Sequence, residues 1–465
     1  MTEMITIPKA KYEGLKARIA KLEQDLAEAL RRLNQNSTNS NLPSSRDLFK
    51  KSKIVSTREK SDKLSGGQPG HKGSNLKQTA TPDSVEIHTP QTCIECDANL
   101  VDMPVDTVAK RQEITVESYK YTREHQVESK TCTCCGKKNV GKFPEHIKGP
   151  VQYSAAIQAD IVYAVLQQMI SCKRFRQEMR EKYDVNISDG TIANAIDALA
   201  KNLSGFENEL VAYMIKAMQA HFDETGININ GKNHWMFVMS DEFVSLFKAH
   251  LNRSQKALDD IAVYPNFTGL AIHDCYEMYF SNENCTHAIC HAHILRELTG
   301  LFEQDVKEEW AQELKNFLIE ANKTRETFSK DMIQEKVQQF RVIVQNGLAY
   351  HASLPILIRD PKKKRGKVPQ RKGKNLLDRL VKYEDAATLF LKNTNVPFTN
   401  NQAERDLRMI KVKLKISIFR EKLWADKFAL IRSYIETAKK LGLDVFAVLI
   451  DALNGRPFSI VTSLP

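Results

Sequence analysis

Three acidic side chains stand out because of the segments that carry them. Asp223 lies in an apolar, strand-like stretch, Asp274 follows the short apolar run 269–273, and Glu404 lies one turn inside a helix-like segment. A carboxylate in a strand of a sheet costs free energy unless it is paired, hydrogen-bonded or bound to a cation. If the two strands are neighbours and the helix packs across them, the three carboxylates converge and require divalent cations to offset their repulsion. Hard oxygen donors favour Mg²⁺ or Mn²⁺, and two such ions about 4 Å apart activate water and stabilise the leaving oxygen in phosphoryl transfer.

The elements that must position these acids are a hairpin, a further strand and a helix. Asn230-Gly231 lies between two aromatic and β-branched runs, and this dipeptide is the strongest short-range signal for a tight turn with positive φ. We therefore expect a three-stranded antiparallel meander over 219–253, with Asp223 on its first strand. The polar start of the segment 399–408 predicts the helix that carries Glu404.

Four segments, FDETG, HDCYEMY, CHAHILREL and NNQAERDLRMIKVKLKIS, resemble the signature segments of the bacterial insertion-sequence sixty-six family of DDE transposases, in the same order. The resemblance implies a multidomain α/β protein whose catalytic domain is a ribonuclease-H-like mixed sheet with a helical insertion. It places Asp223, Asp274 and Glu404 at the family's metal-binding triad, with Mg²⁺ or Mn²⁺ as cofactor and double-stranded DNA, at the transposon ends and the target, as partner. The neighbouring acids are expected to be ordinary solvated charges: Glu224, Glu277 and Asp406.

Two Cys-x-x-Cys pairs form the clearest local motif, and the second pair is followed by a glycine: Cys93 and Cys96, then Cys132 and Cys135. Four thiolates at this spacing suit a closed tetrahedral structural Zn²⁺ site, and the family resemblance also places a zinc finger here. Cys134 could substitute for one ligand, and the alternative is that all are reduced thiols in loops. The stretch 113–127 between the pairs alternates as strands do. Nine cysteines in a reducing compartment argue against a disulfide framework.

The N-terminal region carries a heptad seam flanked by charged residues: Tyr12, Leu15, Ile19, Leu22, Leu26, Ala29 and Leu33. This pattern predicts a coiled-coil helix. It either joins copies into a homo-oligomer, the interpretation that we favour, or docks on its own chain. The basic segment 36–80 is expected to be a flexible linker; its His71 and Lys72 either contact a phosphate or are simply solvated.

Residues 150–212 are helical in pattern throughout. The helix, short turn and helix over 175–199, with Ser188 as a plausible N-cap, are typical of a helix-turn-helix. Basic residues lie on the first helix of this pair rather than on the second. We favour a DNA-contacting module over a bundle that braces the catalytic domain.

Asp274 and Glu404 are 130 positions apart, far more than a crossover helix requires, and the stretch 310–350 has a helix-forming composition. We expect a helical insertion at about 300–390. It contains the run 361–374, which has eight basic residues and no acid. DNA phosphate contact is favoured there over a solvated loop, and such binding weakens with salt because counterions are released. The residues inferred to contact DNA in this run are Lys362, Lys363, Lys364, Arg365 and Arg371.

One cluster invites a second zinc site: His287, Cys290, His291 and His293. We expect its side chains to scatter, because the run passes from a strand, where neighbours face opposite ways, into a helix. By the resemblance, His293 and Arg296 fall at family positions in this segment. They either face the active site, where they hold a phosphate or orient a DNA strand, or serve packing alone.

The segment around Glu404 offers further DNA contacts. Asn400 and Asn401 first signal a helix start and second offer a DNA contact. Arg405 and Arg408 flank Glu404 on the same helix, and their guanidinium groups suit bidentate binding of DNA phosphates.

Bulk properties fit this interpretation. The length of 465 residues suggests about three domains, and 68 basic against 57 acidic residues give a charge of +11, which favours a polyanionic partner. No apolar run is long enough to span a membrane and no signal peptide is recognisable, so we expect a bacterial cytoplasmic protein associated with the nucleoid. The expected divisions are 1–35 coiled-coil helix, 36–80 linker, 81–149 zinc-finger-like module, 150–212 helical region, 213–441 catalytic domain and 442–465 C-terminal tail.

The functional hypothesis is a transposase in which activated water cleaves a phosphodiester at the ends of the element, and the freed 3′-hydroxyl then attacks target DNA. Companion transposition proteins are a further expected class of partner. The alternatives are a catalytically silent, transposon-derived DNA-binding regulator and a ribonuclease-H-like nuclease that cleaves without joining. The run Ser417-Ile418-Phe419-Arg420 lacks the glycine-containing turn of the family, which leaves the activity of this copy open.

Overall fold

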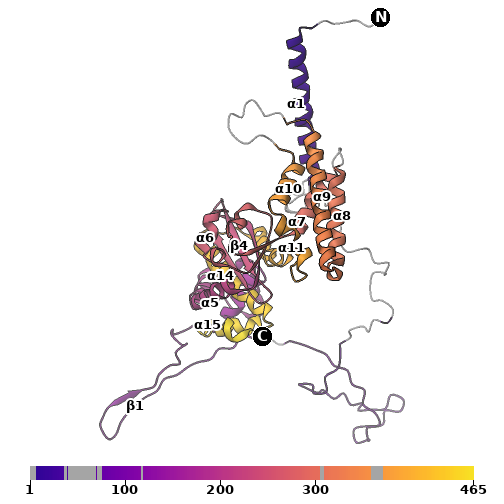
Figure 1. Cartoon of the computed structure of the whole chain (residues 1–465). Helices are drawn as coiled ribbons and strands as arrows, with labels where there is room; N and C mark the ends of the chain where they lie inside the picture. Colours follow the sequence, from indigo (N-terminus) through magenta and orange to yellow (C-terminus); the bar gives the residue numbers. More distant parts are fainter. Residues whose placement is uncertain are drawn as a thin grey trace. The chain divides into compact units, whose positions relative to one another are not determined.

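The computed structural model describes residues 7–35, 39, 70, 76–116, 119–303, 308–357 and 370–464 (Figure 1). The chain divides into two compact units, one made of Met1–Val55 with His125–Pro465 and the other of Ser56–Glu124. The predicted DNA-contacting residues Lys362, Lys363, Lys364 and Arg365, and the linker residues His71 and Lys72, lie outside the described residues.

A mixed five-stranded sheet forms the centre of the larger unit. Its strands are β3 (Gln219–Ile229), β4 (Lys232–Ser240), β5 (Ser245–His250), β6 (Leu270–His273) and β7 (Thr286–Ile289), in the order β5-β4-β3-β6-β7. The first three strands of the sheet are antiparallel, as the sequence predicted, and the turn between β3 and β4 has positive φ at Asn230 (48°) and Gly231 (78°). Strand β6 joins β3 in parallel, and β7 joins β6 in parallel. The expected neighbourhood of the two Asp-bearing strands is therefore confirmed.

Helices from both ends of the larger unit share one hydrophobic core with β3, β4 and β5. They are α2 (Ala155–Val162), η2 (Tyr163–Gln167), α3 (Cys172–Tyr183), α4 (Asp189–Asn202), α5 (Ser204–Lys216), α6 (Gln255–Ile261), α12 (Asn401–Asp406), α13 (Arg408–Ile416), α14 (Lys422–Lys440), α15 (Val445–Leu453) and α16 (Ile460–Ser463). The segment predicted as a C-terminal tail thus carries α15 and α16, and α15 packs against α2 and α4.

Helix α14 covers the edge strand β5. The backbone N–H of Phe247 donates to Ser433 Oγ at 2.8 Å, and the N–H of Ser245 donates to Thr437 Oγ1 at 3.2 Å. Both hydroxyl side chains are completely buried. An uncovered edge strand presents unpaired backbone groups to other chains, so these two side chains replace the partner strand that β5 lacks on this side.

A second hydrophobic core belongs to the helices between Asp274 and Glu404. These are α7 (His291–Phe302), α8 (Glu309–Thr324), α9 (Lys330–Ser353), α10 (Lys372–Lys382) and α11 (Glu384–Lys392). Helix α8 packs on α7 and α9, α10 packs on α9, and α11 packs on the edge strand β7 (Figure 1). The expected helical insertion is present, and it is fastened to the sheet beside the strand that leads into α7.

Helix α1 (Lys9–Asn34) exposes its apolar seam. Leu22, Leu26 and Leu33 are 59%, 60% and 67% exposed, values typical of side chains with no partner surface in this single chain. The seam is therefore available to a partner helix, as a coiled coil requires. Self-association itself stays a prediction.

Candidate active site

Asp223 and Asp274 lie at matching positions in two neighbouring, parallel segments of the chain. The last paired residues of the two parallel strands are His221 and Ile272, and each acid lies two positions further along its own strand. Strand β6 ends at His273, directly before Asp274. Glu404 lies on α12, which packs against β3 and β4. The three acids predicted from the sequence are therefore carried by adjoining elements.

The electrostatics of the acids reflect their mutual proximity. Burial, followed by the charges of Glu224 and Asp274 and finally that of Glu404, raises the pKa of Asp223 well above its usual value. Burial and the charge of Glu224 raise the pKa of Asp274 to about 6, although His293 and Arg253 act in the opposite direction. Carboxylates shift one another in this way only when they lie close together. Their repulsion is the property that a bound cation would relieve.

Arg253 holds the second acid in place. Its Nη2 lies 2.5 Å from Glu224 Oε1 and 3.6 Å from Asp274 Oδ2, and its guanidinium group stacks 3.9 Å from the ring centre of Tyr276. The Tyr276 N–H donates to Asp274 Oδ1 at 3.2 Å. The Tyr279 hydroxyl donates to the other oxygen of Glu224. We call these side chains, with Glu224 at their centre, the Arg253 clamp.

Two of the three neighbouring acids are buried, although all three were expected to be solvated. Glu224 was expected to be solvated, but its side chain is completely buried, because Arg253 and Tyr279 satisfy its oxygens. Asp406 was also expected to be solvated, yet it is largely buried and pairs with Lys440 at 2.9 Å and with the Ser245 hydroxyl at 2.8 Å. Glu277, by contrast, is 80% exposed, as expected. Sequence reasoning missed Arg253 because nothing near it in the chain marks its partner on β3.

Asn400 fixes the helix that carries Glu404. Its side-chain oxygen lies 2.7 Å from His221 Nδ1, and its Nδ2 donates to the Phe222 carbonyl at 2.8 Å. Asn400 stands at the N-cap position of α12, but its side chain makes no capping hydrogen bond. The side chain instead ties the start of α12 to β3, one turn before Glu404. The helix start was predicted correctly, whereas the buried contact with the sheet replaces the DNA contact considered for this residue.

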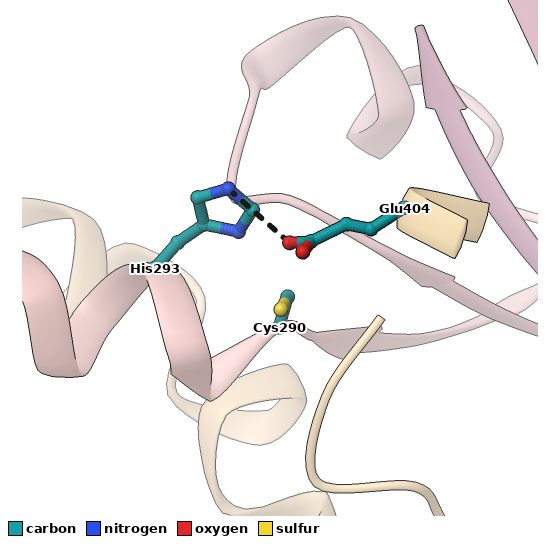
Figure 2. Close-up of side chains that lie close together, drawn as sticks. All are labelled: Cys290, His293 and Glu404. Atoms are coloured by element: carbon teal, nitrogen blue, oxygen red, sulfur yellow. Dashed lines mark ion pairs between the residues drawn. The ribbon is translucent and has the colours of Figure 1, made fainter. Parts of the chain in front are cut away.

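His293 and Arg296, on α7, both face Glu404. His293 Nε2 lies 3.8 Å from Glu404 Oε1 (Figure 2). Arg296 Nη2 lies 3.8 Å from Glu404 Oε2. Burial lowers the pKa of His293, although the charge of Glu404 opposes this, so the imidazole is neutral near pH 7. The structure thus favours the site-facing interpretation of both residues over packing alone.

The remaining histidines of the cluster point elsewhere, as expected. His291 Nε2 donates to the Ala387 carbonyl at 2.9 Å, and His287 lies 3.0 Å from His273. Cys290 differs, because its sulfur joins His293 and Glu404 in a group whose ligand atoms all lie within 4.8 Å of one another. The expectation of scatter is therefore wrong for this pair. Cys290 and His293 are three positions apart across a helix start, and side chains at that spacing share a face.

The predicted DNA-contacting arginines differ in exposure. Arg405 and Arg408 are exposed, on α12 and at the start of α13. Arg371 is half-buried and donates to the Pro355 carbonyl at 2.8 Å, so part of its hydrogen-bonding capacity is used within the chain.

The predicted helix-turn-helix is present in outline as α3 and α4, and Ser188 accepts a capping hydrogen bond from the Thr191 N–H at 3.0 Å. Helix α4, however, buries Ile192, Ile196 and Leu199 in the core shared with the sheet. These helices therefore brace the sheet, and DNA contact by α3 stays a prediction.

The two cysteine pairs form matching turns. The Cys93 N–H donates to Ala98 O and the Asp97 N–H to Cys93 O, at 2.9 and 3.0 Å; Asp97 has φ 54°. The Cys132 turn repeats both hydrogen bonds at 2.9 Å, with Gly136 at φ 69°. Nearby backbone N–H groups lower the pKa of Cys93 and Cys132. Such turns suit thiolates that bind a metal.

The second turn connects β1 (Ser129–Thr131) and β2 (Lys138–Val140). In the described part of 113–127 no strand forms, so the strands predicted there are wrong. An alternating sequence predicts a strand poorly where no other part of the protein buries one face of that strand. The described part of this stretch is almost entirely exposed.

The segment without the family's glycine folds back onto the hairpin. Phe419 is buried and forms a parallel bridge with Ile229, with the Asn230 N–H donating to its carbonyl at 2.8 Å. The turn after α13 is thus closed by contact with the end of β3 rather than by a glycine conformation.

The family model described as the transposase IS66 family matches residues 150–427, a range that contains the three acids, Cys290, His293 and Arg296. A second model, of a family of unknown function (DUF6444), matches residues 2–77, which include α1. A comparison with curated proteins finds no match. Among the described helices, none has both the length and the hydropathy needed to cross a bilayer.

Proposed function

Because the chain belongs to the IS66 family of transposases, we propose that it cleaves DNA at the ends of an insertion sequence and joins those ends to target DNA, with a DDE-type centre. The observation that carries this proposal is the approach of Asp223, Asp274 and Glu404 from three elements, expressed in the raised pKa values of both aspartates. The order of the sheet, three antiparallel strands followed by two parallel ones, supports a ribonuclease-H-like catalytic domain.

The donor set fits divalent cations. All three side chains offer carboxylate oxygens, which suit Mg²⁺ or Mn²⁺, and Glu404 Oε1 is buried without a hydrogen-bond partner in the part of the chain that the structure describes. We propose that Asp223, Asp274 and Glu404 hold two such ions. Bound there, they would supply Lewis-acid activation of the attacking oxygen and stabilisation of the leaving oxygen.

The surrounding side chains position the acids and the DNA. The Arg253 clamp sets the orientation of Asp274, and Asn400 sets the position of α12 and hence of Glu404. Arg296, the cation beside Glu404, would hold a phosphate of the scissile strand. His293, neutral near pH 7, can donate to or accept from that strand without adding charge.

Two further roles are proposed outside the reaction centre. Cys93 and Cys96 share one turn, Cys132 and Cys135 share another, and the geometry of each turn by itself supports the assignment of its cysteines to structural Zn²⁺. The basic run that contains Lys362, Lys363, Lys364 and Arg365 is assigned to DNA phosphates on its charge alone. Zinc analysis of the purified protein, with a Cys132→Ser variant as comparison, tests the first assignment.

The test of function is strand transfer with the purified chain, labelled transposon-end DNA, a target plasmid and Mg²⁺ or Mn²⁺. Asp223→Asn and Glu404→Gln should each reduce joined product by more than about 100-fold, whereas Asp426→Asn, a change at an exposed surface pair, should not. Cleavage without joining would support the nuclease alternative. Specific end binding with neither reaction would support the regulator.

A further inference from the structure

A group of three potential ligands lies at the edge of the acidic site. Cys290 ends the segment between β7 and α7, His293 lies in the first turn of α7, and Glu404 reaches them from α12 (Figure 2). One ligand atom from each lies within 4.8 Å of the other two. Among the Cys, His, Asp and Glu side chains of the described residues, these three are the group whose ligand atoms all lie so close together.

Two atoms of this group lack hydrogen-bond partners within the described chain. Glu404 Oε1 and His293 Nδ1 are both buried and unpaired. The separations of 3.8 Å from Glu404 to His293 and to Arg296 are too long for hydrogen bonds. A buried polar atom without a partner costs about 1–3 kcal/mol. A ligand that satisfies this oxygen and engages this imidazole would remove that cost.

The sulfur of Cys290 has the surroundings of a metal-binding thiolate. It accepts a hydrogen bond from the Asn400 N–H at 3.1 Å, and Cys290 is only 1% exposed. The backbone N–H groups of Ala292 and His293 also act on it, because Cys290 stands at the N-terminus of α7. Such N–H groups fix a ligand atom and stabilise its anionic form. Burial nevertheless raises the pKa of the thiol to about 11, so an ion that binds here displaces the proton of Cys290.

We propose that Cys290, His293 and Glu404 bind a soft divalent ion such as Zn²⁺, at a site that shares Glu404 with the acidic triad. Thiolate and imidazole donors select such ions and are poor ligands for Mg²⁺. Three protein ligands leave one position of a tetrahedral ion open. Ligand atoms of a tetrahedral zinc site lie about 3–4 Å apart, so the present spacing requires a contraction of about 1 Å, which side-chain rotation of Glu404 and His293 can provide.

The shared carboxylate has a functional consequence, and this consequence rests on the function proposed above. An ion held by Cys290 and His293 draws Glu404 towards α7, so that the same carboxylate is less available to complete the site with Asp223 and Asp274. The soft-metal site therefore acts as an inhibitory switch on a Mg²⁺-dependent reaction. Its effect requires no change at Asp223 or Asp274.

Metal binding is tested first, because it does not depend on transposase activity. The full chain, freed of metal, is titrated with Co²⁺, and thiolate-to-cobalt absorption is recorded for wild type, Cys290→Ser and Cys285→Ser. Cys285 is a matched control, since it is also buried but lies outside the group. We expect Cys290→Ser to bind one equivalent less than wild type, with Cys285→Ser unchanged. Equal stoichiometry and spectra in wild type and Cys290→Ser would overturn the site. Circular dichroism checks that both variants are folded.

The inhibitory role is tested second, with strand transfer in Mg²⁺ as the readout. For each protein the ratio of product with and without added Zn²⁺ is measured, which corrects for any change in basal rate. Zn²⁺ should lower this ratio at least about tenfold in wild type and in Cys285→Ser, and much less in Cys290→Ser. Equal inhibition of all three proteins would rule out the shared role of Glu404. If none of the proteins transfers strands, the proposed function fails, while the cobalt titration still decides the metal site.

Discussion

At the residue scale, one half-buried cation, Arg253, links two acids of the site. The charges of Glu224, Asp274 and Glu404 all raise the pKa of Asp223, and Arg253 contacts two of these four carboxylates, Glu224 and Asp274. Arginine suits this position because its planar group can pair with carboxylates at its edge while its face stacks on Trp235 and Tyr276. The clamp thus combines charge balance with orientation of Asp274.

This arrangement predicts that Arg253→Met lowers the free energy of unfolding by roughly 3–5 kcal/mol, because Glu224 is left as a buried and largely uncompensated charge. Urea unfolding followed by circular dichroism measures the change. Arg456→Met is the control, since Arg456 is 72% exposed in its pair with Asp451, and less than about 1 kcal/mol is expected there.

The double variant Arg253→Met with Glu224→Gln separates stability from positioning. Removal of the Glu224 charge should restore most of the lost stability, because no buried charge is then unpaired. The Mg²⁺ concentration needed for half-maximal strand transfer should be higher than in the wild type, as in the single variant Arg253→Met, since Asp274 lacks its partner Arg253 in both. Recovery of both quantities together would show that Arg253 has only a structural role.

At the scale of elements, the contacts of α14 explain how the sheet ends. Ser433→Ala removes the acceptor of the Phe247 N–H in a fully buried position, and we expect a loss of about 1–3 kcal/mol. Amide hydrogen exchange of Phe247 should quicken in the same variant. Thr462→Ala, a change at an exposed site, serves as the control and should alter neither quantity. Unchanged exchange at Phe247 would mean that water or another group replaces the hydroxyl.

Helices α12 and α13 carry exposed basic residues at spacings of three, three and four: Arg405, Arg408, Lys411 and Lys415. Arg408, Lys411 and Lys415 lie on one face of α13 and form a basic stripe, and Arg405 precedes it on α12, next to Glu404 in the chain. Such a stripe can follow a DNA backbone that leads to the active site.

The stripe predicts that the pair of changes Lys411→Ala and Lys415→Ala weakens DNA binding uniformly across sequences. The slope of log affinity against log salt should become shallower by about 0.9 for each phosphate that the variant no longer neutralises. Fluorescence anisotropy with end DNA and unrelated DNA measures both effects. Lys422→Ala is the matched control, because Lys422 is already paired with Asp426 within α14. An unaltered slope would place the DNA on another surface.

The elements show which parts of the fold the sequence could predict. Asn230-Gly231 determines the hairpin locally, and the apolar strand before Asp274 follows from composition, so the sheet around the acids could be predicted. The Arg253 clamp and the side chain of Asn400 could not, because their partners are distant in the chain and only tertiary packing brings them together. The closeness of Cys290 and His293 was not predicted for another reason. Side chains alternate between two faces along a strand, but these two residues lie at the start of a helix, where a spacing of three brings side chains to one face.

At the scale of the whole molecule, the proposed reaction joins two DNA ends, and each copy of the chain would provide one proposed triad. A means of pairing copies is therefore expected, and the exposed seam of α1 provides a surface for it. A coiled coil buries such a seam between two helices, and charged residues flank it here on both sides. The seam lies in the region matched by the family of unknown function rather than in the transposase match.

The last prediction is that Leu22→Glu with Leu26→Glu converts the full chain to a monomer, because two acids in the seam would be buried beside the same acids of the second helix. Sedimentation equilibrium should give a lower mass than for wild type, while Glu23→Gln, a change of an exposed residue beside the seam, should keep the wild-type mass. Cleavage of a single end depends on one triad and should persist, whereas concerted joining of two ends should fall. A wild-type mass in the double variant would assign α1 to contacts within its own chain and would move the pairing of ends to another surface.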